Sequence, residues 1–330
     1  MSALLQTEDL NVWFDLPRGG TLHAVQGVSL RLERGERLGL VGESGCGKTT
    51  TGLALMGLLP PNATAAGSIE LEGTDILGGG EETLRPHRWV DVAMVFQGAM
   101  NAFNPVKRIG EQIAEPMEMH GTASGKAARA QVRELLELVG ISGSRADRYP
   151  HEFSGGMRQR ASIAMALACQ PRILLADEPT TALDVMVQAQ ILDLLTRLSS
   201  ELGLALVLVT HDLPVVAQTC GRAAVMYAGE IAEAGPMETL FHAPRHPYTR
   251  LLFAATPDLY GDEEVVSIGG APPRLDRPMT GCPFQPRCDV VLDRCAGQHP
   301  ALRLVGAGHE AACHHTEDQA QDRTERVGST

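Results

Sequence analysis

The chain has 330 residues, which corresponds to about two domains, and this length allows a large buried core. Its formal net charge of −12 argues against broad electrostatic binding to nucleic acid or to an anionic membrane surface. We expect a soluble, cytosolic chain, because no basic and apolar signal segment is visible and the most apolar runs, such as residues 204–209, are too short to cross a bilayer.

The first part of the chain predicts strands, a loop and a helix. Alternating apolar residues predict strands near residues 10–14 and 25–32. The stretch ERLGLVGESGCGKTTTGLALMGLLPP is then typical of a strand, a glycine-rich loop and a helix that stops at the prolines 60–61. This order indicates an α/β unit whose loop is built to bind an anion.

The middle of the chain, about residues 105–170, is predicted to be helical. Its apolar residues recur on one helical face, and Gly140 suits the left-handed position just past a helix end. A short strand at 173–176 follows, then helical spacing over 187–198, then the run at 204–209, which is typical of a buried parallel strand. Because strands and helices alternate, the core is predicted to be α/β. The residues of the helical face are Val132, Leu135, Leu136 and Val139.

The pattern changes near the end of the chain. After residue 256 the sequence becomes rich in Pro, Gly and Cys, so we place a domain boundary near Pro257. The last residues are polar enough to form a disordered tail. The predicted division is a first domain at 1–256, with a helical subdomain at about 105–170, a Cys-rich extension at 257–318 and a tail at 319–330.

The glycine-rich loop carries the strongest motif. Its sequence GESGCGKT matches G-x-x-x-x-G-K-S/T between a predicted strand and a predicted helix, and this context argues against a chance match. Glycines let backbone N–H groups surround phosphate oxygens, Lys48 reaches the β- and γ-phosphates, and Thr49 offers a hydroxyl to Mg²⁺. The predicted ligands are ATP and Mg²⁺, and the residues assigned to them here are Gly42, Ser44, Gly45, Cys46, Gly47, Lys48, Thr49 and Thr50.

Cys46 has two interpretations. It lies near Lys48 and a helix N-terminus, where the pKa of a thiol tends to fall, so a redox switch is one hypothesis. A small residue that the loop tolerates is the other.

Two adjacent acids end the next apolar strand. The stretch ILLADEP places Asp177 and Glu178 at the edge of a sheet where ligands of α/β folds gather. A P-loop NTPase needs one carboxylate for Mg²⁺ and a second group that orients or deprotonates water. We therefore assign Asp177 to Mg²⁺ and Glu178 to the water, with a solvated strand end as the weaker alternative.

Several motifs together resemble the nucleotide-binding subunit of ABC transporters. They are the P-loop, FSGGMRQR, LLADEPTTALD, the glutamine of MVFQ and the histidine of LVTHD, in the expected order over about residues 4–255. The resemblance implies a P-loop ATPase with a RecA-like core sheet, an antiparallel β subdomain, a helical signature subdomain and, here, a small Cys-rich C-terminal extension. It implies that Gln97 contacts Mg²⁺ and the membrane partner, that Glu178 is the catalytic base and that His211 contacts the γ-phosphate.

Two further roles follow only from the resemblance. Asp184 would be the D-loop residue, and Phe14 would stack on adenine. A Trp13–Phe14 pair in a strand is more often part of a core than a ligand platform.

The signature sequence predicts a second anion site. Ser154, Gly155 and Gly156 precede a helix expected to run to about Cys169, so they form a helix N-terminus. The motif departs from the commonest form, LSGGQ, at its first and last positions. By resemblance, this end binds the γ-phosphate held by the P-loop of another subunit, so a dimer is implied.

Longer stretches resemble one group of ABC proteins more closely. YPHEFSGGMRQR, DEPTTALDVMVQAQI, HPYTRLL and GCPFQPRC are similar to the ATPases of oligopeptide and dipeptide importers, a group that also serves nickel and some oligosaccharides. The resemblance implies an ATPase at the cytoplasmic face of the membrane and no nucleic acid partner. The implied partners are a second ABC ATPase subunit, identical or homologous, two integral membrane permease subunits and an extracytoplasmic solute-binding protein.

An ATPase of another class is the main rival. A DNA-repair type ABC ATPase would need a coiled coil or a zinc-bearing insertion and basic patches, which this acidic sequence does not show. A regulatory protein with a vestigial ATPase conflicts with the intact motif residues.

Four cysteines cluster near the end with the spacing C-x5-C-x6-C-x17-C. Four soft thiolates suit a single metal centre, and a 4Fe–4S cluster is favoured over Zn²⁺ because no close C-x2–4-C pair is present. Nearby histidines offer a zinc site a replacement ligand, and unligated thiols are the third possibility. A structural role, such as docking the two ATPase subunits, is favoured over redox sensing. The residues concerned are Cys282, Cys288, Cys295 and Cys313, with His299, His309, His314 and His315.

Overall fold

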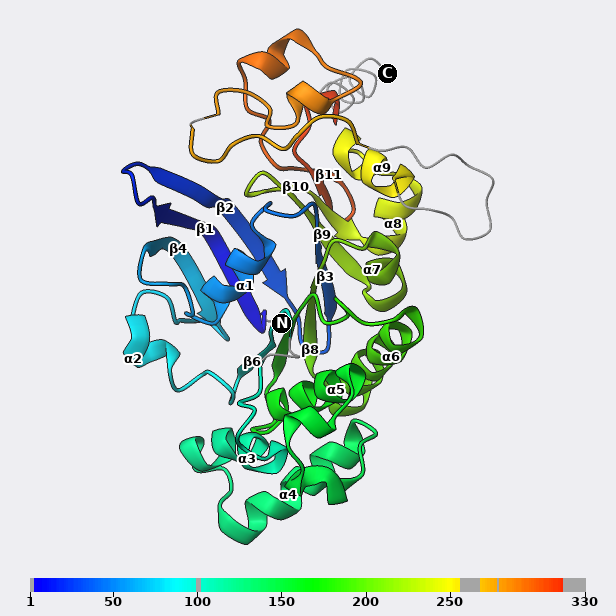
Figure 1. The fold of residues 1–330 in the computed structure, drawn as a ribbon. Coiled ribbons are helices and arrows are strands. Elements are labelled where there is room, and N and C mark those ends of the chain that lie inside the picture. Colours follow the sequence, from blue (N-terminus) through cyan, green and yellow to red (C-terminus); the bar gives the residue numbers. More distant parts are fainter. Residues whose placement is uncertain (1–2, 99–101, 256–267, 278, 317–330) are drawn as a thin grey trace.

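The computed structural model describes residues 3–98, 102–255, 268–277 and 279–316 (Figure 1). The predicted boundary near Pro257 and the predicted tail at 319–330 lie outside these residues. Within the described ranges, no helix combines the length and the apolar character that a membrane span requires.

A four-stranded antiparallel sheet contains the predicted N-terminal strands. Its strand order is β2-β1-β4-β5, and all three pairings are antiparallel. The strands expected near residues 10–14 and 25–32 fall within β1 and β2, so both are confirmed. The bounds are β1 Leu5–Asp15, β2 Thr21–Leu32, β4 Ala63–Leu71 and β5 Thr74–Asp75.

An eight-stranded mixed sheet forms the centre of the fold. Its order is β11-β12-β10-β9-β3-β8-β7-β6, in which β9, β3, β8, β7 and β6 are parallel. Every residue of β7 and β8 is buried, which confirms the prediction of apolar parallel strands there. The bounds are β3 Arg37–Val41, β6 Val92–Val95, β7 Ile173–Asp177, β8 Ala205–Thr210, β9 Arg222–Tyr227, β10 Glu230–Pro236, β11 Arg303–Gly306 and β12 His309–Ala311.

Helices cover the central sheet and also form a group of their own. Helices α3, α4 and α5 gather at the lower end of the molecule in Figure 1, within the segment predicted to be helical. Gly140 follows α4 with φ +77°, as expected for a residue just past a helix end. The bounds are α1 Lys48–Leu55, α2 Gly80–Leu84, α3 Ile109–His120, α4 Gly125–Leu138, α5 Gly155–Ala166, α6 Val185–Leu202, α7 Leu213–Thr219, α8 Met237–His242 and α9 Pro247–Ala254.

Helix α5 is shorter than the sequence indicated. We expected it to run to about Cys169, and it ends at Ala166. The amide of Ala168 donates to the carbonyl of Met165, three residues earlier, which tightens the chain into a turn. The end of the helix therefore lies about one turn earlier than predicted.

The C-terminal segment joins the central sheet. Strand β12 pairs with β10 in the antiparallel sense, and β11 pairs with β12. Two 3-10 turns, η4 (Gln285–Arg287) and η5 (Asp293–Ala296), lie in the part drawn in orange at the top of Figure 1. The segment thus extends the edge of the sheet.

A buried glutamate ties this segment to the sheet. Glu233 on β10 is fully buried, and its carboxylate accepts hydrogen bonds from the amides of Arg245 and His246 at 2.6 and 2.9 Å. His309 Nε2 on β12 lies 2.6 Å from the same carboxylate. One side chain therefore connects β10, β12 and the start of α9.

Candidate functional site

The glycine-rich loop lies between β3 and α1. Gly42, Gly45 and Gly47 have φ values of +155°, +80° and +105°. A Cβ atom on Gly42 would lie 2.2 Å from the carbonyl oxygen of Met226, so a larger residue would collide with β9. The path of the loop therefore requires glycine. Of the other predicted loop residues, Ser44 is exposed and Thr50 is half-buried in the first turn of α1.

Lys48 is held inside the loop. Its side chain is buried, and Nζ donates to the carbonyl oxygens of Gly42 and Glu43 at 2.7 and 2.9 Å. The ammonium group thus lies within the turn that the loop makes, where a P-loop lysine reaches the β- and γ-phosphates.

The surroundings of Cys46 distinguish its two interpretations. The redox-switch hypothesis requires a lowered thiol pKa, but burial raises the pKa, and the nearby Lys48 ammonium only partly offsets this. The residue is 4% exposed. Desolvation of a thiolate thus outweighs one nearby positive charge. A small residue packed into the loop fits these observations better than a redox switch.

Asp177 lies beside the start of α1. Its Oδ1 accepts a hydrogen bond from Thr49 Oγ1 at 3.2 Å. Burial raises the pKa of Asp177, the bond from Thr49 opposes this, and the charge of Glu178 adds to the increase. A hydroxyl and a carboxylate oxygen are ligands that Mg²⁺ prefers, so the chemistry of this pair fits that ion.

Glu178 is the centre of a hydrogen-bonded group. Gln97 Nε2 donates to its carboxylate at 2.8 Å, Thr181 Oγ1 donates at 2.9 Å, and His211 Nδ1 lies 3.1 Å away. The structure thus brings together the three residues assigned to catalysis. Thr181 was not among the predicted site residues, although it lies in LLADEPTTALD, three positions after Glu178.

The pKa values of the two adjacent acids are shifted in opposite directions. Burial works against ionisation of Glu178, but the hydrogen bonds from His211 and Thr181 outweigh it, so the pKa of Glu178 is lowered. The pKa of Asp177 is raised. Neighbouring acids with pKa values moved apart can take different roles, and Glu178 is the one kept ionised.

Glu178 also has an unusual backbone. Its φ is +42°, in the left-handed region, and its amide donates to the carbonyl of Val209 at 2.8 Å. Strained backbone of this kind persists where the surroundings hold it, and such residues concentrate at functional sites.

The signature residues begin α5. Ser154 is exposed, and its hydroxyl accepts a hydrogen bond from the amide of Met157 at 3.3 Å, which makes it the N-cap. Gly155 and Gly156 form the first turn. Phe153 is 4% exposed and packs into the core, so the position where LSGGQ has leucine also holds a buried apolar residue here.

Phe14 and Asp184 each have a local structural role. Phe14 is half-buried in β1 and packs against the core of the antiparallel sheet, while Trp13 stacks on His23 at 4.7 Å between ring centroids. Asp184 is the N-cap of α6, accepting from the amide of Val187 at 2.9 Å. Their roles in binding adenine and in the D-loop stay predictions.

The four C-terminal cysteines are neighbours. The amide of Cys282 donates to the carbonyl of Cys295 at 2.8 Å. The pKa values of Cys282 and Cys313 are raised to about 11, mainly by burial and in smaller part by charge on the other thiols of the cluster. Among the described residues, however, no group of three or more Cys, His, Asp or Glu side chains is arranged to hold a metal ion.

The nearby histidines have other partners. Two of them contact glutamates of β10, and two contact backbone carbonyls. We therefore find no support for a histidine in place of a cysteine ligand. The pairs are His299 with Glu230, His309 with Glu233, His314 with the carbonyl of Gln298 and His315 with the carbonyl of Val290.

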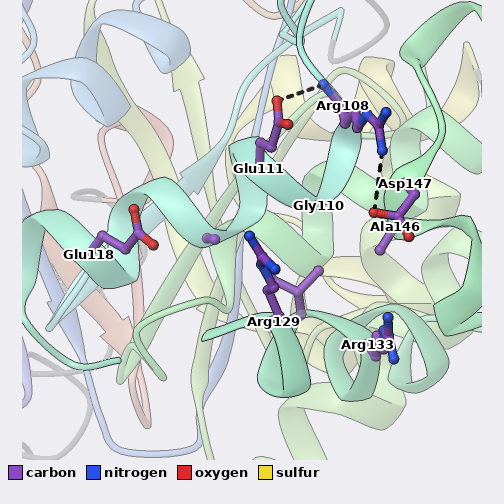
Figure 2. A pocket seen from close by; sticks show the side chains of 10 residues that line it. Arg108, Gly110, Glu111, Glu118, Arg129, Arg133, Ala146 and Asp147 are labelled. Atoms are coloured by element: carbon purple, nitrogen blue, oxygen red, sulfur yellow. Dashed lines mark hydrogen bonds and ion pairs between the residues drawn. The ribbon is translucent and has the colours of Figure 1, made fainter. Parts of the chain in front are cut away.

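A cavity of about 430 Å³ lies in the helical part of the molecule (Figure 2). Side chains of both charges line it, from α3, α4 and the turn that follows α4. Arg108 spans its edge, with its amide bonded to Glu111 at 3.2 Å and its guanidinium 3.7 Å from Asp147. None of the P-loop or strand-end residues lines it, so it is separate from the predicted nucleotide site.

Comparison with known families gives two matches. The model described as "ABC transporter" matches residues 25–181, which include the P-loop, Gln97, the signature and Glu178. The model described as "Oligopeptide/dipeptide transporter, C-terminal region" matches residues 232–295, which include three of the four C-terminal cysteines.

Individual proteins are similar over nearly the whole chain. The dipeptide transport ATP-binding protein DppD of Bacillus subtilis (strain 168) is 45% identical over 95% of this chain and 95% of its own length. DppD of Escherichia coli (strain K12) is 43% identical over 96% of this chain and 98% of its own length. A solved ATP-binding cassette, a dimer in a post-hydrolysis state bound to ADP and Pi, is 28% identical with a TM-score of 0.63, over 71% of this chain and 98% of that one.

Proposed function

This chain belongs to the ABC transporter family, among the ATP-binding subunits of dipeptide and oligopeptide transporters, and from this we propose that it hydrolyses ATP to power peptide import. The family membership confirms the resemblance drawn from the motifs. The observation that carries the proposal is the carboxylate of Glu178, kept ionised and held by Gln97, Thr181 and His211.

The arrangement supports hydrolysis of the γ-phosphate. We assign the P-loop and Lys48 to the phosphates, and Thr49 and Asp177 to Mg²⁺. When bound, Mg²⁺ neutralises charge that develops on the phosphoryl oxygens. The ionised Glu178 orients a water and accepts its proton as the water oxygen attacks the γ-phosphorus. The bond to the bridging oxygen then breaks, and ADP and phosphate leave.

We assign the exposed end of α5 to a second subunit. Ser154 and the first-turn N–H groups form a helix N-terminus, which favours a phosphate group. Each chain has one P-loop and one signature, so two chains would enclose two ATP molecules. The solved cassette described above is a dimer, which agrees with this proposal.

The transported solute is selected by other chains. We propose that this subunit binds the cytoplasmic side of two permease subunits, which receive peptide from an extracytoplasmic solute-binding protein. Nickel and oligosaccharides are the alternative solutes. The relatives are named for dipeptide and oligopeptide transport, which favours peptides.

Reconstitution tests this proposal. Proteoliposomes that contain the permease subunits, a second ATPase subunit and this chain should take up a labelled dipeptide when supplied with ATP and the solute-binding protein. Matched vesicles with Glu178→Gln should take up none. Uptake of nickel or an oligosaccharide without peptide uptake would reject the peptide assignment, and failure to copurify with the permeases would reject the transport role.

We further propose that the four C-terminal cysteines hold one metal centre, a 4Fe–4S cluster in preference to zinc. Their spacing supports this, and so does their closeness: charge on one thiol of the cluster raises the pKa of another. Because burial favours the protonated thiols, metal binding would have to release protons. Anaerobic purification with iron, sulfide and zinc analysis tests it: about four irons per chain support the cluster. Zinc alone would leave a structural Cys-rich module, and no metal would reject both.

A further inference from the structure

A partly buried ion pair joins the C-terminal segment to the P-loop. Arg287 lies in η4, between Cys282 and Cys288, and its side chain is 3% exposed. Its Nη1 and Nη2 atoms donate to the two carboxylate oxygens of Glu43 at 2.7 and 2.8 Å. Glu43 is the second residue of the P-loop motif. This two-bond geometry is the strongest form of an arginine–carboxylate contact.

Arg287 is fixed in place by further contacts. It donates to the carbonyl of Gly269 at 2.8 Å and to the hydroxyl of Tyr227 at 3.3 Å. Its guanidinium lies over the rings of Tyr227 and Phe284, 5.7 and 5.9 Å from their centroids. The arginine is therefore oriented toward Glu43 before any ligand binds.

The backbone of Glu43 connects this pair to the phosphate-binding lysine. Its amide donates to the hydroxyl of Tyr248 at 2.9 Å, and its carbonyl accepts from Lys48 Nζ at 2.9 Å. Movement of the Glu43 side chain would therefore shift a carbonyl that holds the lysine. Without Arg287, the Glu43 carboxylate would also be an unpaired negative charge in the loop assigned to a polyanion.

We propose that Arg287 is a positioning residue that, through Glu43, sets the affinity of the P-loop for ATP and couples it to the C-terminal segment. The inference rests on the proposed function only in that ATP is the ligand. Coupling between two sites is reciprocal, so bound ATP must in turn stabilise the segment around Arg287.

The first test measures nucleotide affinity. Arg287→Gln should raise the Kd for a fluorescent ATP analogue and the KM for ATP about tenfold, with kcat changed by less than about twofold, because the catalytic group around Glu178 is untouched. Arg287→Lys keeps the charge and loses the two-bond geometry, so its Kd for the ATP analogue should lie between those of the unaltered chain and Arg287→Gln.

A matched control comes from the same segment. Arg250 and Asp289 form an exposed ion pair that joins α9 to the residue after Cys288 and has no bond to the P-loop. Asp289→Asn should therefore bind the ATP analogue as the unaltered chain does. If Arg287→Gln is poorly folded by circular dichroism, Glu43→Gln breaks the same pair from the other side. A raised Kd for the ATP analogue in Glu43→Gln then supports the inference, and an unchanged Kd overturns it.

The second test measures the reciprocal effect. Hydrogen–deuterium exchange of residues 281–296 should slow when ATP is added, and this protection should be lost in Arg287→Gln and kept in Asp289→Asn. Unchanged ATP affinity in the Arg287 and Glu43 variants, or equal protection in all of them, would overturn the inference. Failure of the unaltered chain to bind ATP would instead reject the proposed function.

Discussion

At the scale of single residues, Glu178 gives the sharpest prediction. Glu178→Gln keeps the size and the hydrogen-bonding capacity of the side chain but removes the group that accepts a proton. We expect ATP affinity to be retained and kcat to fall at least about a hundredfold. Steady-state ATPase assays and binding of an ATP analogue measure the two effects. Unchanged hydrolysis would show that Glu178 is not the base.

Thr181 predicts a change in pH dependence. The hydrogen bond from its hydroxyl and the hydrogen bond from the His211 ring together hold the pKa of Glu178 below its ordinary value. Thr181→Val removes this bond, so the pKa should rise. Because the base must be ionised, the acidic limb of the kcat profile should move to higher pH. Thr181→Ser keeps the hydroxyl and should leave the profile in place; identical profiles for valine and serine would contradict the role given to Thr181.

Motifs predicted single residues well where chemistry and local sequence coincide. The loop glycines, Lys48 and the adjacent acids are recognisable because phosphate and Mg²⁺ binding demand those types at fixed spacing. The pairing of Arg287 with Glu43 spans 244 positions and has no local pattern, so only the folded chain reveals it. For Cys46 the motif left two interpretations open, because the burial of the thiol cannot be predicted from the motif.

At the scale of elements, the apolar patterns predicted β1, β2, β3, β7 and β8 and the helices α4 and α6, but not the buried strands β6, β9 and β10. They also missed β11 and β12, which are short and partly exposed and exist because β10 offers them an edge. The burial of Glu233 could not be predicted from the sequence either, because an isolated glutamate in a strand is usually solvated. Tertiary contacts, and not local propensity, determine these parts.

The buried Glu233 predicts how firmly β12 is held. Glu233→Ala would leave His309 and two backbone amides without their shared acceptor, so we expect a loss of about 3 kcal/mol in the free energy of unfolding. Glu230→Gln is the matched control, because Glu230 pairs with the partly exposed His299 on the same strand. The control should cost less than about 1 kcal/mol. Equal urea midpoints for both variants would contradict this role.

At the scale of the whole molecule, the site is incomplete in one chain if the signature acts on another subunit's ATP. Lys48→Ala removes a phosphate ligand, and Ser154→Arg places a cation and extra bulk at the start of α5, so each variant alone should be inactive. A mixed dimer would combine the intact Lys48 of one chain with the intact Ser154 of the other at one of its two sites.

Mixing the two variants should therefore restore activity. Random pairing makes about half of the dimers mixed, and each mixed dimer has one complete site of two, so we expect about a quarter of the normal ATPase rate when one site suffices. Differently tagged variants, captured in sequence, establish that mixed dimers form. If they form and hydrolyse no ATP, the N-terminal end of α5 and the P-loop of the partner subunit do not make a working site on their own, and the shared-site proposal loses its support.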